Sequence, residues 1–185
     1  MSQGQDRIES VVKTIAEVCV ENERYFCELD SVAGDGDFGY SLARGFEKVL
    51  SDWDAYDRSD PGTFLSKVAV TMSSRIGGSS GPIWGTAFLR AATAIKGKHD
   101  LNRDDAVNML RAAIDGIKAR GGADVGDKTL LDALVPLADE VANDVPAQND
   151  AKAVVIRAAS AARTGAQKTS FMIARRGRAS YTGER

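Results

Sequence analysis

Apolar residues recur at the spacing of an α-helix along almost the whole chain, and this periodicity constrains the fold more than any other feature of the sequence. Residues three and four positions apart lie on one face of a helix, so each apolar stripe predicts an amphipathic helix. No segment shows the sustained alternation of apolar and polar residues that marks a half-buried strand. We therefore expect an all-α fold, a bundle of antiparallel helices with about seven helices in this chain. The stripes lie at residues 8–26, 42–53, 64–72, 84–95, 107–117, 130–141 and 153–174.

Proline and glycine mark the boundaries of several of these helices. The sequence Asp60-Pro61-Gly62 predicts a helix start, because proline suits the first turn of a helix. Gly97 and the pair Gly121-Gly122 predict helix ends. The chain of 185 residues contains no repeat, low-complexity tract or linker, so we expect residues 1–185 to form a single domain.

The charge and hydropathy of the chain exclude several kinds of partner. A formal net charge of −2 gives no argument for nucleic-acid binding. No apolar run approaches the roughly 20 residues that a membrane helix needs, and the polar N-terminus lacks the apolar core of a signal peptide. We therefore predict a cytoplasmic protein with neither a nucleic-acid nor a membrane partner.

Three aspartates, Asp30, Asp35 and Asp37, lie close together in a segment with glycine between and after them. The glycines permit the tight turns that would point the carboxylates inward. Such carboxylates repel one another unless a cation neutralises them, and hard oxygen ligands with room for water and phosphate suit Mg²⁺. The segment predicts a magnesium site. The alternative is a solvated acidic turn in which Asp35 and Asp37 cap the next helix.

A glycine- and serine-rich turn, residues 77–82, precedes the helix predicted around residues 84–95. Its small residues allow backbone N–H groups to approach a ligand. A helix N-terminus beside the hydroxyls of Ser79 and Ser80 is a favourable site for an anion. The alternative is an ordinary serine-capped loop. Phosphate binding is favoured beside a magnesium loop, because a metal-bound nucleotide needs contacts both to the cation and to its phosphates.

A third glycine-rich turn, residues 121–129, has the look of a Walker A loop but does not match one. Asp127 separates Gly126 from Lys128, and no strand precedes the turn. Taken alone, the turn is a helix start with Thr129 placed to cap the helix that follows.

The few remaining reactive side chains give weaker signals. Cys19 and Cys27 lie in one helical pattern, so we interpret them as buried apolar thiols and not as a metal or redox pair. His99, the single histidine, lies in a polar segment and is expected to be solvated. The basic segment 175–178 is either a solvated helix end or a phosphate contact, since Arg178 between small residues could bind a phosphate with two hydrogen bonds.

Four segments of this chain resemble the nucleotide-binding subunits of dihydroxyacetone kinases. They appear in the family's order with similar spacing over essentially the whole chain, and on them the chain is identified as a member of that family. They are residues 29–39, 77–82, 126–129 and 177–185. The resemblance implies a barrel of eight antiparallel helices that holds ADP or ATP at one rim through two Mg²⁺ ions.

The resemblance also implies a role for individual residues. Asp30, Asp35 and Asp37 match the family's magnesium ligands and are the predicted catalytic residues. Other positions match contacts to the phosphates or the adenosine. These nucleotide contacts are Phe38, Gly39, Ser41, Gly78, Ser79, Ser80, Gly121, Thr129, Leu130 and Arg178.

Two departures from the family's pattern bear on function. The family usually has histidine where this chain has Phe38, and phenylalanine cannot donate a hydrogen bond to a phosphate. This difference points to altered nucleotide handling or to another ketose, such as a tetrulose. Family members also continue past the element that ends at Arg185 with a lid loop and a last helix. We expect this chain to lack both.

The resemblance implies a phosphotransferase subunit. It would transfer a phosphoryl group from the magnesium nucleotide to dihydroxyacetone, or a related short ketose, held by a separate sugar-binding kinase subunit through that subunit's histidine. The donor is either free ATP or a phosphotransferase-system protein that rephosphorylates bound ADP, and a homodimer is left open. Two alternatives are a nucleotide-loaded signalling module without catalysis of its own and the nucleotide domain of a fatty-acid kinase.

Overall fold

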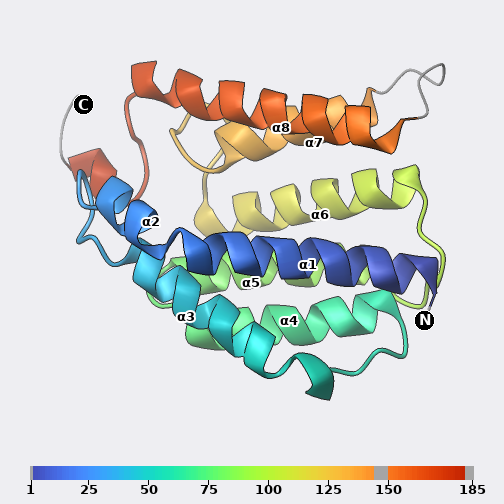
Figure 1. Cartoon of the computed structure of the whole chain (residues 1–185). Coiled ribbons are helices and arrows are strands. Elements are labelled where there is room, and N and C mark those ends of the chain that lie inside the picture. Colours follow the sequence, from blue (N-terminus) through green and yellow to red (C-terminus); the bar gives the residue numbers. More distant parts are fainter. Residues whose placement is uncertain (1, 144–149, 182–185) are drawn as a thin grey trace. The chain divides into compact units, whose positions relative to one another are not determined.

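The computed structural model describes residues 2–143 and 150–181, and these residues form α-helices and short 3-10 turns without any strand (Figure 1). The expectation of an all-α fold is confirmed. The α-helices are α1 (Gln3–Glu21), α2 (Glu23–Asp30), α3 (Phe38–Ser51), α4 (Pro61–Arg75), α5 (Ser80–Ala94), α6 (Arg103–Gly121), α7 (Leu131–Ala142) and α8 (Ala151–Lys168). The 3-10 turns are η1 (Trp53–Ala55), η2 (Thr169–Phe171) and η3 (Arg178–Tyr181).

The described residues contain eight α-helices, so the expected count of about seven is corrected. The first apolar stripe is not one helix, because Asn22 separates α1 from α2. The side-chain amide and the backbone N–H of Asn22 both donate to Val18 O, at 2.8 and 3.1 Å. An asparagine that bonds to a backbone carbonyl in this way competes with continuation of the helix. The additional helix is therefore α2, and it lies near the N-terminus.

The last apolar stripe also differs from the helix that forms. We expected this helix to continue to residue 174, but α8 ends at Lys168 and is followed by η2. Met172, which caps η2, has extended backbone angles. The chain therefore leaves the axis of α8 after Lys168. The segment that contains Arg178 does not continue this helix.

The predicted start of α4 is confirmed. Asp60 occupies the N-cap position with Pro61 in the first turn, and its carboxylate accepts hydrogen bonds from the N–H groups of Gly62 and Thr63, at 2.8 and 3.0 Å. These bonds satisfy N–H groups that have no partner inside the helix. Gly97 and Gly122 adopt positive φ angles of 77° and 59° after α5 and α6, as helix-ending glycines commonly do.

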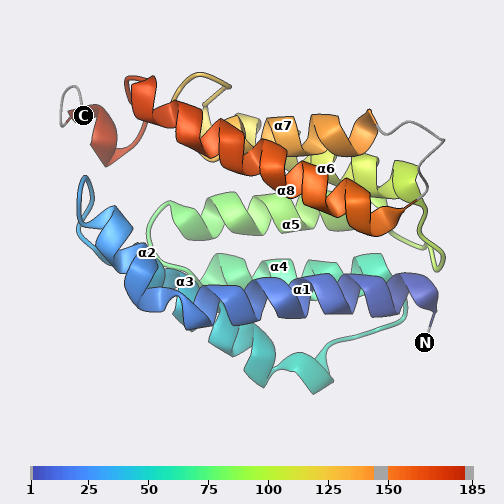
Figure 2. The same ribbon diagram turned by 45° about the horizontal axis from the view of Figure 1, so that its top comes forward.

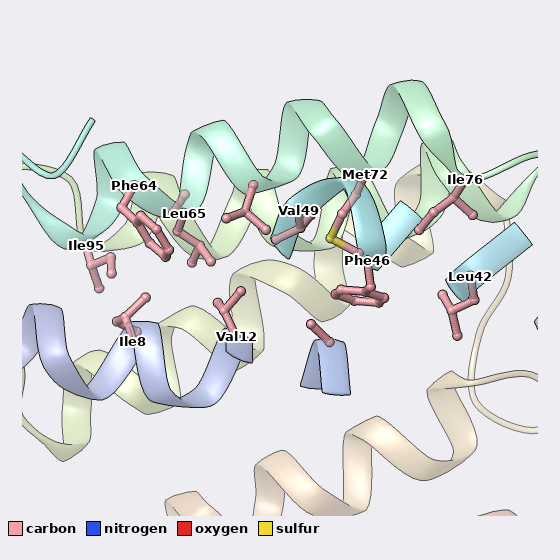
Figure 3. Packing of buried hydrophobic residues seen from close by; sticks show 13 residues of the cluster. Ile8, Val12, Leu42, Phe46, Val49, Phe64, Leu65, Met72, Ile76 and Ile95 are labelled. Carbon is pink, nitrogen blue, oxygen red and sulfur yellow. The ribbon is translucent and has the colours of Figure 1, made fainter. Parts of the chain in front are cut away.

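The chain divides into two compact units at Gly116 and Ile117, within α6. The expectation of a single domain stays a prediction. In the first unit, α4 and α5 pack side by side, and α1 and α2 pack against α3 (Figure 2). Their apolar faces enclose one core, of which Figure 3 shows the side chains. This core consists of Ile8, Val12, Ala16, Leu42, Phe46, Val49, Phe64, Leu65, Val68, Met72, Ile76, Ala92 and Ile95.

In the second unit α7 packs against α8. Gly165 permits the close approach, since a Cβ at this position would overlap Asp132 O and lie 3.1 Å from its carbonyl carbon. Pro136 lies inside α7 and has no N–H to donate to that same carbonyl. Gly165 therefore allows tight packing of α8 on α7.

Two further expectations concern the cysteines and the membrane. Cys19 and Cys27 are free thiols, but both are half-buried and not fully buried as predicted. Cys19 packs against the outside of the core, and Cys27 packs against Gly39. Burial raises the pKa of the Cys19 thiol to about 11. Among the residues that the structure describes, no helix has the length and hydropathy to cross a bilayer.

Candidate functional site

The carboxylates of Asp30, Asp35 and Asp37 come together, each offering an oxygen within 4.8 Å of the other two. Asp30 is the last residue of α2 and is half-buried, whereas Asp35 and Asp37 are exposed in the turn that leads to α3. Three negative charges at this separation repel one another strongly unless a cation lies between them. The structure thus brings together the residues that the sequence predicted as metal ligands.

The turn after α2 is shaped by Asp30. Its backbone carbonyl accepts from the N–H groups of Ala33 and Gly34, at 3.1 and 2.6 Å, and its Oδ2 accepts from Gly36 N at 2.9 Å. Gly36 has a φ of 76°, which a residue with a side chain rarely adopts. A Cβ at Gly34 would lie 2.6 Å from Asp30 Cγ. These two glycines therefore let the turn close around the Asp30 carboxylate.

Asp37 occupies the N-cap position of α3, yet its side chain makes no capping hydrogen bond. This observation weighs against the alternative in which Asp37 serves as a helix cap. Its backbone carbonyl accepts from Ser41 N at 2.9 Å, so Ser41 lies one turn into the helix whose first residue follows the cluster.

Close packing of α3 on α2 fixes the start of α3. A Cβ at Gly39 would overlap Glu23 O and lie 2.7 Å from Cys27 N. Tyr40 N donates to Cys27 Sγ at 3.2 Å, and the Phe38 ring lies 6.4 Å from that of Phe26. Gly39 thus has a packing role that the sequence did not reveal, because its neighbours belong to another helix. Its predicted contact with a nucleotide stays a prediction.

The glycine- and serine-rich turn lies beside the first turn of α3. A Cβ at Gly77 would lie 3.2 Å from Ser41 Oγ, so the two segments nearly touch. Gly78 has a φ of 61°, and Ser79 occupies the N-cap position of α5 without a side-chain capping bond. The exposed Ser79 hydroxyl does not act as the cap that the alternative of a serine-capped loop required. The first unit therefore combines three carboxylates and an open helix N-terminus.

Three predicted site residues of the second unit, Gly121, Thr129 and Leu130, lie around the turn between α6 and α7. Gly121 is the last residue of α6, and Leu130 precedes the first residue of α7. Thr129 Oγ1 accepts from Leu131 N at 3.2 Å, but the N-cap position belongs to Leu130, one residue later than predicted. The difference arises because Asp132 takes over part of the capping.

Asp132 is a functional candidate that the sequence reading missed. Its carboxylate is buried and accepts hydrogen bonds from Gly126 N at 2.6 Å and Thr129 N at 2.8 Å. The spacing of Thr129 and Asp132 is that of a capping box, with aspartate in the place of the usual glutamate, and this is the signal that could have found it. Asp132 therefore holds the turn before α7 at two points.

Asp127 links this turn to the basic C-terminal segment. Its Oδ2 accepts from Asp124 N at 3.1 Å and pairs with Arg176 Nε at 3.3 Å. The N–H of Asp124 and the Arg176 guanidinium hold the pKa of the Asp127 carboxyl below its ordinary value. Arg178 is exposed in η3. The part of the predicted motif after Tyr181 lies outside the described residues.

The second unit also contains an open groove of about 590 Å³ between α7 and α8. Pro136 and Glu140 line it from α7, and Ser160, Thr164 and Lys168 line it from α8. None of the predicted site residues lines this groove. The groove is therefore separate from the residues that the sequence selected.

A family model and two known proteins match this chain. The family model described as the DAK2 domain matches residues 32–185. The chain is 37% identical over its full length to "PEP-dependent dihydroxyacetone kinase, ADP-binding subunit DhaL" of Escherichia coli (strain K12), and it covers 88% of that protein. It is 36% identical over 96% of its length to "L-erythrulose 1-kinase" of Mycolicibacterium smegmatis, of which it covers 31%.

The fold is shared with a solved structure. The crystal structure of the dihydroxyacetone kinase of C. freundii matches 97% of this chain with a TM-score of 0.74, at 24% identity. The chain covers 31% of that larger protein. Because the family model matches most of the chain and the E. coli relative matches it along its whole length, this chain belongs to the DAK2-domain family, which includes the ADP-binding subunits of dihydroxyacetone kinases.

Proposed function

We propose that this chain is the nucleotide-holding subunit of a phosphotransferase that phosphorylates a short ketose. The observation that carries the proposal is the convergence of Asp30, Asp35 and Asp37, whose carboxylate oxygens lie within 4.8 Å of one another. The names of relatives that share over a third of this sequence point the same way, since one is an ADP-binding kinase subunit and another is a ketose kinase.

The three carboxylates fit magnesium. They offer only hard oxygen donors, and the exposure of Asp35 and Asp37 leaves room for water and phosphate, which Mg²⁺ retains among its ligands. We assign Asp30, Asp35 and Asp37 as the residues that hold two Mg²⁺ ions. Bound there, these ions would neutralise the charge of the phosphates during transfer.

The neighbouring helix N-terminus supplies contacts for the phosphates. Backbone N–H groups at the start of α5 and the hydroxyls of Ser79 and Ser80 are donors, and donors at a helix N-terminus favour an anion. Ser41 lies beside this turn and is well placed to share in the binding. Phe38, Gly39 and Gly78 are assigned to the same nucleotide site. Gly121, Thr129, Leu130 and Arg178 of the second unit stay predicted nucleotide contacts, as the resemblance to the family implies.

The described residues point to no group of this chain that would hold the ketose acceptor. The chain contains one histidine, His99, which is exposed in the segment between α5 and α6 and is remote in sequence from the aspartate turn. The two larger kinases that it resembles are about three times as long, and this chain corresponds to 31% of each. We propose that a separate sugar-binding kinase subunit provides the remaining part.

The E. coli relative supports a phosphotransferase-system donor over free ATP, because its name describes a PEP-dependent kinase with an ADP-binding subunit. A phosphotransferase-system protein would then rephosphorylate ADP that stays bound to Asp30, Asp35 and Asp37 through magnesium. The acceptor is dihydroxyacetone or a tetrulose. The likeness to an L-erythrulose kinase at 36% identity supports testing the tetrulose first.

Calorimetric titration with ADP in the presence of magnesium tests the nucleotide site. We expect the wild-type chain to bind ADP and Asp35→Asn to bind at least about tenfold more weakly, because one ligand charge is lost. Asp100→Asn is the matched control, since Asp100 is exposed and lies outside the cluster. Equal affinity in the wild type and Asp35→Asn would remove the metal assignment.

A reconstituted assay tests the transfer. The chain is combined with a sugar-binding kinase subunit and with either ATP or a phosphotransferase-system donor, and dihydroxyacetone and L-erythrulose are compared as acceptors. We expect a phosphorylated ketose that requires all components. Absence of product with every partner and donor would favour a nucleotide-loaded signalling module, whereas phosphorylation of a lipid on a lipid-binding partner would favour a fatty-acid kinase.

A further inference from the structure

Lys128 has a φ of 60° and is the only non-glycine residue with a positive φ among residues 2–143 and 150–181. Residues with a Cβ rarely adopt this left-handed backbone conformation. Such a residue persists only where its surroundings hold it in place, and these residues gather at functional sites. The contacts around Lys128 therefore indicate what this conformation achieves.

The turn around Lys128 is held from both sides by one buried carboxylate. Asp132 accepts from Gly126 N at 2.6 Å and from Thr129 N at 2.8 Å, and its side chain is nearly inaccessible to solvent. Gly126 itself has a φ of 92°. The residues between these two anchors, Asp127 and Lys128, are thus presented on a fixed turn.

Both of these residues contact a segment that lies more than 40 positions later in the chain. Asp127 O accepts from Arg175 N at 3.2 Å, and Asp127 Oδ2 pairs with Arg176 Nε at 3.3 Å. Lys128 Nζ donates to Met172 O at 3.1 Å. Both residues therefore contact the segment Met172–Arg176, which leaves α8 after η2.

This segment leads directly to Arg178. Gly177 has a φ of 64°, and its carbonyl accepts from Ser180 N at 3.2 Å and from Ser180 Oγ at 2.7 Å. These bonds begin η3, whose first residue is Arg178. A series of hydrogen bonds therefore connects Asp132, through the turn at Lys128, to the segment that ends at Arg178.

We propose that Asp127 and Lys128 are positioning residues that fix Arg178 for a phosphate of the bound nucleotide. This inference rests on the proposed function, in which Arg178 contacts the nucleotide. A guanidinium binds phosphate with two hydrogen bonds only in a restricted orientation. Because the segment before Arg178 is held at three points, less conformational entropy is lost when Arg178 takes up that orientation. The left-handed turn at Lys128 directs its ammonium and the Asp127 carboxylate toward the same segment.

Titration calorimetry of the full chain with ADP and magnesium tests the proposal through pairs of substitutions. Lys128→Met removes the ammonium but keeps most of the aliphatic side chain, and Arg176→Gln removes the ion pair with Asp127. We expect each to weaken ADP binding about fivefold, and Arg178→Ala to weaken it about tenfold or more. In a chain that already carries Arg178→Ala, Lys128→Met should cause no further loss.

A merely structural role gives a different pattern. If Lys128→Met only loosens the turn, its effect multiplies with that of Arg178→Ala, and the proposal is wrong. Lys118→Met is the matched control, because Lys118 pairs with Asp124 of the same turn at 2.6 Å but has no bond to Met172–Arg176. We expect it to bind ADP as the wild type does. Should Lys128→Met fail to fold, Arg176→Gln carries the same test, since the Arg176 side chain is 53% exposed.

The result also separates this inference from the proposed function. If Asp35→Asn weakens ADP binding and Arg178→Ala does not, the metal site stands and the positioning role is refuted. If neither substitution changes the affinity for ADP, both the proposed function and this inference are wrong.

Discussion

Asp30 Oδ2 accepts a hydrogen bond from Gly36 N at 2.9 Å, so the last residue of α2 closes the turn that carries Asp35. The same carboxylate fills the space that a side chain at position 34 would need. Asp30 therefore shapes the turn as well as contributing an oxygen to the cluster. Asp35 and Asp37 are exposed in the same turn.

Gly34→Ala should disturb the cluster more than it disturbs the fold. The added Cβ would lie 2.6 Å from Asp30 Cγ, so the carboxylate must leave its position in the cluster. We expect magnesium-dependent ADP binding to weaken about tenfold with a small change in Tm. Gly97→Ala is the control, because Gly97 also sits in a turn, at a φ of 77°, but outside the cluster. Full ADP affinity in Gly34→Ala would contradict the role assigned to Asp30.

Phe38→His should tighten ADP binding. Phe38 is the first residue of α3, next to Asp37, and histidine there would add a donor that phenylalanine lacks. Because the pKa of an unperturbed histidine is about 6.5, the gain should be larger at pH 6 than at pH 8. Calorimetry at both values measures it. Phe26→His removes the same ring contact without placing a donor at the start of α3, so it should not tighten binding.

Asp60 should make the stability of the fold depend on pH at acidic pH values. Burial opposes ionisation of its carboxyl, but hydrogen bonds from Thr63, Gly97 and Gly62 outweigh it and hold the pKa below its ordinary value. Such a group stabilises the fold above the unfolded pKa of about 3.9, and its contribution is lost as pH falls through the folded pKa. We expect the Tm of Asp60→Asn to fall less steeply below pH 4 than that of the wild type. Exposed Asp54→Asn should follow the wild type.

The same aspartate allows a test at neutral pH. Asp60→Ala should lower the free energy of unfolding by about 1 kcal/mol, because the first turn of α4 loses its N-cap. Urea unfolding followed by circular dichroism measures the change. A stability equal to that of the wild type would show that water replaces the carboxylate without cost.

Phe64→Ala should be among the most destabilising substitutions in the first unit. The ring is fully buried and meets the rings of Trp53 and Tyr56 edge-on, at centroid distances of 5.2 and 5.8 Å. Removing it leaves a cavity, for which about 3–5 kcal/mol of unfolding free energy is expected. Phe171→Ala is the matched control, since that ring is 93% exposed and its loss should change stability by less than about 0.5 kcal/mol.

The sequence was most informative where the signal is local. The cap at Asp60 involves residues that are neighbours in the chain, so composition and spacing suffice to predict it. The aspartate turn is similar, because its carboxylates and glycines all lie within one short segment. The break at Asn22 was missed, since asparagine inside an apolar stripe is usually tolerated by the helix, and only its bonds to Val18 O reveal the end of α1.

The sequence did not predict the contacts between segments that are distant along the chain. The packing of Gly39 on Glu23 and Cys27, and the bonds from Asp127 and Lys128 to Met172–Arg176, join residues whose spacing carries no periodic signal. Periodicity reports which face of an element is apolar but not which element covers it. The sequence by itself determined the all-α class, the family and the grouping of three aspartates in one turn. Only the tertiary structure decided which side chains hold those segments in place, because such contacts depend on how the helices pack.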